Sequence, residues 1–259
     1  MAAADNGARA LRHGASWASG LEERVADEEQ LEAVRREWLR RVEAEYGSAA
    51  LTHHLTSWLL SIAAPFELIR MGLSIVDDEL THAELSQAVY AAAGGVGAAR
   101  LARAGLGLRP AGGEALELGV ARVGLESFCL GETVAVRLFA RLRQGCDEPA
   151  AQVALDRILK DEVKHREFGW TLLEWLLSTG FEAPVRRLAA AELPQMFARL
   201  RANYAFASLT EPAARDALSQ RWGLMPAADY ARALQEALVR DYVPRFADLG
   251  IDAERAWQP

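Results

Sequence analysis

The chain has 259 residues, 51% of them hydrophobic, which is enough to bury a sizeable core in one large domain or two small ones. Its net charge of −7 and isoelectric point near 5.4 argue against nucleic acid and anionic membranes as partners, because both require clustered Lys and Arg. The two cysteines, Cys129 and Cys146, exclude a four-cysteine metal site within one chain and disfavour a disulfide framework, so we expect a reducing, cytoplasmic location.

The composition also sets the class of fold. Ala and Leu are abundant and β-branched residues are sparse, a balance that favours helix almost everywhere. The N-terminus lacks the apolar core of a secretory signal, and no stretch offers about 18 apolar residues without charges. We therefore expect an all-α protein that neither follows that export route nor spans a membrane.

In chain order, residues 1–26 have little periodicity and predict a flexible N-terminal arm. Asp27 opens a helical pattern with acidic residues in its first turn, and the pattern ends before Pro65. Pro65 suits the start of a second helix, which stops at Gly94 and Gly95. These two segments predict a helical hairpin.

A Gly-rich segment, 94–113, follows this hairpin and is too long for a tight turn. Fully extended, it covers on the order of 60 Å, enough to run back along a helix of roughly 28 residues. A third helix is predicted over 113–144 and a fourth over 149–178, forming a second hairpin. Two hairpins joined by one long crossover predict a four-helix bundle over residues 27–180.

Residues 181–259 predict a C-terminal helical extension. Shorter helices are expected at roughly 183–205, 211–220 and 226–247, with apolar residues at helical spacing. We expect these apolar faces to pack on the bundle as a cap or as the surface of a homodimer.

Two segments, DDELTHAEL and ILKDEVKHREFGW, share one pattern of charged residues. In the order Asp-Glu-x-x-His, the repeated residues are Asp78, Glu79, His82, Asp161, Glu162 and His165. With 24 Glu and 5 His in the chain, chance gives roughly half of one Glu-x-x-His pair, so the repeat is far more informative than one instance. Positions i and i+3 share a helix face, so each Glu and its His can reach a metal in the bundle centre.

A two-metal site also needs a carboxylate from each of the other two helices. Glu45 lies 34 residues before Glu79, and Glu132 lies 30 residues before Glu162, so each pair is centred on a predicted turn. In a hairpin of antiparallel helices, residues equidistant from the turn lie at the same height along the bundle axis. Glu45 is therefore expected at the height of Glu79, and Glu132 at the height of Glu162. Glu43 is an alternative to Glu45.

The helix faces support this choice of carboxylates. The positions one and two turns from Glu132 are apolar, so Glu132 is expected to point inward, whereas Glu126 lies on a more polar side. Two metal cations would neutralise carboxylates that are otherwise costly to bury. Asp78 and Asp161 are expected to accept the proton of the histidine on the opposite hairpin. His53 either borders the pocket or is an ordinary residue of the helix surface.

On these residues the chain resembles the ferritin-like non-haem di-iron carboxylate proteins, and more narrowly the ferritin-like oxygenases of bacterial secondary metabolism. The resemblance covers roughly residues 27–178 and rests on a Glu followed about 30 residues later by Asp-Glu-x-x-His, twice. It implies a ferritin-like four-helix bundle with a long crossover between helices 2 and 3, plus additional C-terminal helices. The arylamine N-oxygenases share the acidic spacing, but Ile158 stands where a seventh, histidine ligand would be expected.

The resemblance implies a catalytic dinuclear site in which Glu79 and Glu162 bridge two iron ions, or one manganese and one iron. The implied ligands are Glu45, Glu79, His82, Glu132, Glu162 and His165. Ligation rich in carboxylates independently favours these metals over zinc or copper. Asp78 and Asp161 would accept hydrogen bonds from the ligand histidines and hold their rings in place.

The leading functional hypothesis is an oxygenase or oxidase that uses dioxygen to oxidise a small organic substrate, with the C-terminal extension shaping a pocket. A ferroxidase or peroxide-reducing protein is the alternative. A non-catalytic scaffold would not need buried carboxylates at matched heights. The chain has no flavin or iron–sulfur signature, so we expect electrons from an external reductase, ferredoxin or similar donor.

Overall fold

The computed structural model describes residues 5–102, 106–109, 112–211 and 216–258, with side chains described from Asp27 onward. Every regular element within these residues is a helix, which confirms the all-α prediction. None of the described helices is both long enough and apolar enough to cross a membrane.

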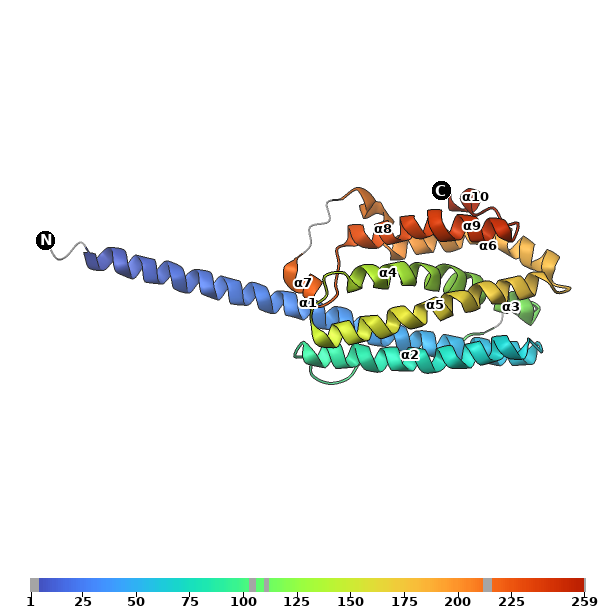
Figure 1. Ribbon diagram of the computed structural model, residues 1–259, viewed down its shortest axis with the longest axis horizontal. Helices are drawn as coiled ribbons and strands as arrows, with labels where there is room; N and C mark the ends of the chain where they lie inside the picture. The colour runs from blue at the N-terminus through green and yellow to red at the C-terminus, as the bar shows by residue number, and fades with distance from the viewer. Residues whose placement is uncertain (1–4, 103–105, 110–111, 212–215, 259) are drawn as a thin grey trace.

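Long helices lie side by side in the body of the molecule (Figure 1). Helix α1 (Asp5–Ser61) packs along α2 (Phe66–Ala92), and α2 packs along α5 (Pro149–Leu177). The predicted start of α1 at Asp27 is wrong, because its helix begins at Asp5 and its N-terminal part projects beyond the other helices (Figure 1). The sequence has no proline before Pro65 and is rich in Ala at this end, and both features favour a continuous helix. Residues 1–4 of the predicted arm lie outside the described part.

The third segment is continuous from Leu116 to Arg143 but is not one α-helix. It consists of α3 (Leu116–Val123), a π-helix (Gly124–Glu132) and α4 (Thr133–Arg143), and it packs against α5. The end of α2 and the start of α3 lie at opposite ends of the bundle (Figure 1), so the connection between them runs the length of the helices, as its length predicts. The π-helix was not predicted.

The C-terminal extension packs on the third segment and α5. Its elements are α6 (Glu182–Asn203), a 3-10 helix (Phe206–Thr210), α7 (Ala217–Arg221), α8 (Ala227–Ala237), a second π-helix (Leu238–Tyr242), α9 (Val243–Asp248) and α10 (Ala253–Trp257). Helix α6 contacts α3, the first π-helix and α5, while α8 contacts α4. The single helix predicted over 211–220 is wrong, since only α7 forms there and residues 212–215 lie outside the described part. Helix α10 was not predicted.

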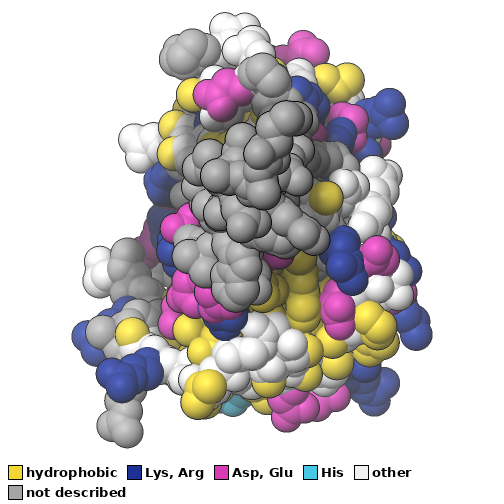
Figure 2. Space-filling view, turned by 90° about the vertical axis from the view of Figure 1, so that its left-hand side faces the viewer, with side chains coloured by type: hydrophobic (Ala, Val, Ile, Leu, Met, Phe, Trp, Pro, Cys, Tyr) yellow, Lys and Arg dark blue, Asp and Glu magenta, His cyan; other side chains and the backbone are white. Residues whose placement is uncertain are grey.

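The end of the molecule from which α1 projects carries charge of both signs. On the described atoms of this face, Lys and Arg side chains are interspersed with Asp and Glu side chains around an apolar area (Figure 2). This visible surface therefore offers no large area of one charge.

Two glycines allow the helices to approach closely near the centre of the bundle. Gly169 on α5 faces the first π-helix, where an added Cβ would lie 2.6 Å from Phe128 Cβ and 2.8 Å from the backbone nitrogen of Cys129. Gly72 on α2 likewise faces Thr56 on α1. Gly72 lies two turns before Glu79 and Gly169 lies two turns after Glu162, so each close contact sets the distance between helices that carry the predicted ligands.

We expect Gly169→Ala to destabilise the protein by about 2–3 kcal/mol, because the new methyl group meets backbone atoms of the π-helix that cannot rotate away. Urea unfolding of the metal-free protein measures the change. Gly47→Ala is the control, since Gly47 lies in α1 with nothing near its added Cβ, and Ala there should stabilise by about 0.5–1 kcal/mol. Equal effects of the two substitutions would contradict the close contact at Gly169.

Candidate metal centre

The structure brings all six predicted ligands together in the centre of the bundle. They form two groups, each with ligand atoms within 4.8 Å of one another, namely Glu45, His82 and Glu162, and Glu79, Glu132 and His165. Each group takes its members from three different segments of the bundle. The two halves of each Glu-x-x-His motif belong to different groups, so neither hairpin completes a group alone.

Glu79 lies between the two histidines. Its Oε2 is 3.5 Å from His82 Nδ1, and its Oε1 is 3.5 Å from His165 Nδ1. Glu162 spans the groups in the same way, since it belongs to the group of His82 and its Oε2 is 3.8 Å from His165 Nδ1. Each of these two carboxylates therefore lies near both histidines, and the bridging role of each stays a prediction.

Five of the six side chains are buried and Glu132 is half-buried. Four atoms that face the centre have no hydrogen-bond partner within the described residues: Glu79 Oε2, His82 Nδ1, Glu162 Oε2 and His165 Nδ1. Unsatisfied buried polar atoms are uncommon and each calls for a specific cause. Two bound cations, one in each group, would satisfy all four.

Without a metal, the buried carboxyl groups of the centre are difficult to ionise, and their pKa values are raised. Burial, reinforced by the charge of Glu132, raises the pKa of Glu79 to about 8. Burial also raises the pKa of Glu45 and of Glu162 well above the usual range, with further contributions from Glu79 and Glu132 respectively. Burial lowers the pKa of His165. The metal-free centre therefore favours protonated carboxyl groups and a neutral imidazole, whereas metal ions would favour the ionised carboxylates.

Each aspartate lies beside the histidine of the other hairpin, but only Asp161 makes the predicted hydrogen bond. His82 Nε2 donates to Asp161 Oδ2 at 3.2 Å, which directs the Nδ1 lone pair of His82 toward the carboxylates. His165 Nε2 lies 3.5 Å from Asp78 Oδ2, too far for a good hydrogen bond. Asp161 therefore supports the histidine of the other hairpin, whereas His165 Nε2 has no hydrogen-bond partner within the described residues.

Two cations that the sequence analysis did not identify hold these aspartates in place. Arg157 bonds to Asp161 through Nε and to Asp78 through Nη2 at 2.8 Å. Lys164 Nζ lies 2.9 Å from Asp78 Oδ2 and 2.9 Å from Asp161 Oδ1. Burial alone would raise the pKa of Asp161, but bonds from Arg157, Lys164 and His82 lower it to about 2. Arg157 and Lys164 are four residues before and three after Asp161, a helical spacing that could have revealed them.

The π-helix ends at Glu132 and positions this carboxylate. A π-helix accommodates an extra residue within a turn and occurs frequently at functional sites. Its carbonyl at Leu130 accepts a hydrogen bond from the Tyr242 hydroxyl at 2.6 Å, which ties the C-terminal extension to the residue two before Glu132. Ser48 on α1, also missed from the sequence, donates to Glu79 Oε1 at 2.8 Å.

The alternatives left open by the sequence are resolved by burial. Glu43 is exposed, whereas Glu45 joins the cluster. Glu126 points away and accepts a hydrogen bond from Arg199 at 2.6 Å. His53 is exposed and does not border the centre, and Ile158 is fully buried in an apolar cluster.

Comparison of the chain with protein-family models, with curated proteins and with solved structures gives no match.

Proposed function

We propose that this protein is a ferritin-like di-iron oxygenase or oxidase, or a manganese–iron equivalent, that uses dioxygen to oxidise a small organic substrate. The observation that carries the proposal is the buried set of four carboxylates and two imidazoles with inward-facing atoms that lack partners. Four ionised carboxylates would balance the charge of two divalent cations. Oxygen-rich ligation with two imidazoles suits iron or manganese better than zinc or copper.

The residues of the chain would bind, orient and shield such a centre. Glu45 and His82 would serve one metal and Glu132 and His165 the other, with Glu79 and Glu162 shared. Asp161 fixes the ring of His82, so that its Nδ1 faces inward. Two reduced metal ions held together can supply two electrons to dioxygen, and the surrounding buried apolar residues limit the access of water.

Metal analysis of the purified protein tests the proposal most directly. Anaerobic loading with Fe²⁺ should give about two ions per chain, and oxygen uptake should follow on mixing with aerated solvent. Glu45→Ala should lower the metal content below two ions, while Glu43→Ala, an exposed carboxylate two residues away, should leave it unchanged. A protein that binds no metal under these conditions would contradict every di-iron hypothesis.

The same experiment separates the alternative function. A ferroxidase that stores iron would continue to take up Fe²⁺ beyond two ions per chain and accumulate ferric mineral. An oxygenase would stop at two ions and consume further oxygen only with an electron donor. Iron uptake that rises in proportion to added Fe²⁺ and oxygen would therefore overturn the oxygenase proposal.

A further inference from the structure

The outer face of α2 carries an apolar stripe that is exposed in the single chain. Phe66, Leu73 and Leu80 recur at intervals of seven residues and are 80%, 53% and 40% exposed. Ile69 and Val76 lie between them on the same stripe and are half-buried. The intervals alternate between three and four residues, which is the spacing of helices that pair with one another. Contiguous exposed apolar surface of this kind marks a site of contact with another molecule.

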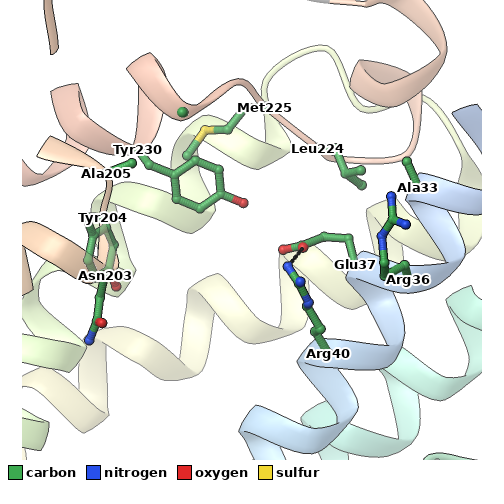
Figure 3. Close-up of a pocket in the computed structure, with 11 residues that line it drawn as sticks. Ala33, Arg36, Glu37, Arg40, Asn203, Tyr204, Ala205, Leu224, Met225 and Tyr230 are labelled. Carbon is green, nitrogen blue, oxygen red and sulfur yellow. Dashed lines mark ion pairs between the residues drawn. The ribbon is translucent and has the colours of Figure 1, made fainter. Parts of the chain in front are cut away.

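The C-terminal extension leaves this face open because it packs on the other side of the bundle. In Figure 1, α2 lies along one edge of the molecule, and α8, α9 and α10 lie along the opposite edge. Figure 3 shows where the extension approaches α1: Tyr230 from α8 and Glu37 and Arg40 from α1 line a cavity of about 460 Å³. Helix α2 packs on α1 and α5 through its other face, which includes the buried residues Ile75 and Glu79.

Two exposed residues of opposite charge, Arg70 and Asp77, flank the stripe. Each directly follows one of the half-buried residues, Ile69 and Val76. Positions seven residues apart share a helix face, so both charges lie on the same side of the stripe. Charges beside the apolar seam of paired helices select the partner and its direction. This flank can therefore pair with a reversed copy of itself.

Antiparallel pairing of two α2 helices matches these positions. If Leu73 of one copy packs beside Val76 of the other, Arg70 of each copy lies about 3 Å along the axis from Asp77 of the other, within reach of its guanidinium. Two-fold symmetry forms this ion pair twice. A parallel pair would instead bring the two charges opposite the position of Glu79, which is buried in its own bundle.

The face is also large enough for a stable dimer. Helix α2 has 27 residues and is about 40 Å long. Each helix is about 10–12 Å wide, so α2 and the adjoining α1 together offer about 800 Å² per chain, the area of a standard interface. Leu60, near the end of α1 and 59% exposed, extends the apolar part of this area.

We propose that two copies of this chain form a dimer by antiparallel pairing of their α2 helices, with the apolar stripe at the centre and Arg70 of each copy paired with Asp77 of the other. This surface differs from the C-terminal extension, whose apolar residues Leu188, Leu193 and Phe197 are buried within one chain. The dimer does not depend on a bound metal.

Sedimentation equilibrium of the full-length, metal-free protein tests the proposal. The wild type should have a mass near twice the 28.3 kDa of one chain. Leu73→Glu places a charge at the centre of the stripe and should weaken the dimer by about a hundredfold or more. Because Leu73 is more than half exposed, circular dichroism should show no loss of helix. Val239→Glu, at a 61% exposed valine of the C-terminal extension, is the control and should leave the dimer unchanged. A monomeric wild type, or a dimer that Leu73→Glu leaves intact, would overturn the inference.

Charge reversal tests the antiparallel arrangement, and it does so even if Leu73→Glu fails to fold. Arg70→Asp and Asp77→Arg should each weaken the dimer by about tenfold, because each places like charges opposite one another twice per dimer. The double variant Arg70→Asp/Asp77→Arg should regain the wild-type affinity, since the two positions exchange charge across the interface. A double variant as weak as the two single effects combined would overturn the pairing. Contact of this face with a different protein would give no such rescue of self-association.

Discussion

Glu79→Gln is expected to stabilise the metal-free protein at pH 8 by about 2–5 kcal/mol and to abolish the binding of two metal ions. The pKa of Glu79 is about 8 in the folded metal-free protein and 4.5 when unperturbed. Between these values the folded state keeps a proton that the unfolded state has lost, so stability falls as the pH rises from about 4.5 to 8. A difference of this size corresponds to about 5 kcal/mol above pH 8.

Gln removes this penalty because it is neutral at every pH and has nearly the same shape as Glu. It can still accept the hydrogen bond from Ser48 through its amide oxygen. It cannot provide the negative charge and the second oxygen that a bridging ligand requires. The gain in stability should therefore be present at pH 8, fade as the pH falls, and vanish below about 4.5.

Urea unfolding of the chelator-treated protein at pH 5 and pH 8 measures this effect, and metal analysis measures the loss of binding. Glu43→Gln is the matched control, because Glu43 is exposed and its substitution should change neither quantity. If Glu79→Gln destabilised the protein equally at both pH values, its carboxyl group would not titrate in a buried site. Adding Fe²⁺ should stabilise the wild type and leave the variant nearly unchanged.

The parts of the centre that could be predicted from sequence depend on regular geometry. Glu45 and Glu132 were predicted because each lies as many residues before a turn as Glu79 or Glu162 lies after it. This count places the two residues of a pair at one height, since helices rise by a constant amount per residue. Asp161 followed from its place beside Glu162 and from the tendency of ligand histidines to donate to a carboxylate. Both inferences needed only the spacing along helices whose ends were marked by Gly and Pro.

The parts that could not be predicted depend on packing between distant segments. The π-helix that ends at Glu132 lies where Gly169 allows α5 to approach closely and where the Tyr242 hydroxyl donates a hydrogen bond to the carbonyl of Leu130. Neither contact can be recognised in the local sequence. The bond from Arg41 Nη2 to the carbonyl of Gly223 likewise joins residues that are far apart in the sequence.

Asp161→Ala is expected to weaken metal binding by about tenfold to a hundredfold, mainly at the position served by His82. The variant removes the acceptor for His82 Nε2, so the ring is free to rotate and its Nδ1 loses basicity as a ligand. Arg157 and Lys164 are 40% and 52% exposed, so both can turn to solvent and the fold should survive. Competition titration with a chelator under anaerobic conditions measures both affinities.

The metal affinities of two further aspartate variants serve as controls for this prediction. Asp78→Ala should have a smaller effect than Asp161→Ala, because Asp78 lies 3.5 Å from His165 Nε2 and makes no good hydrogen bond to it. Asp156→Ala, on the same helix as Asp161 but exposed and paired with Arg143, should bind metal like the wild type. Wild-type affinity in Asp161→Ala would mean that helix packing alone orients His82. The network of Arg157 and Lys164 would then stabilise the two hairpins against each other without tuning the metal centre.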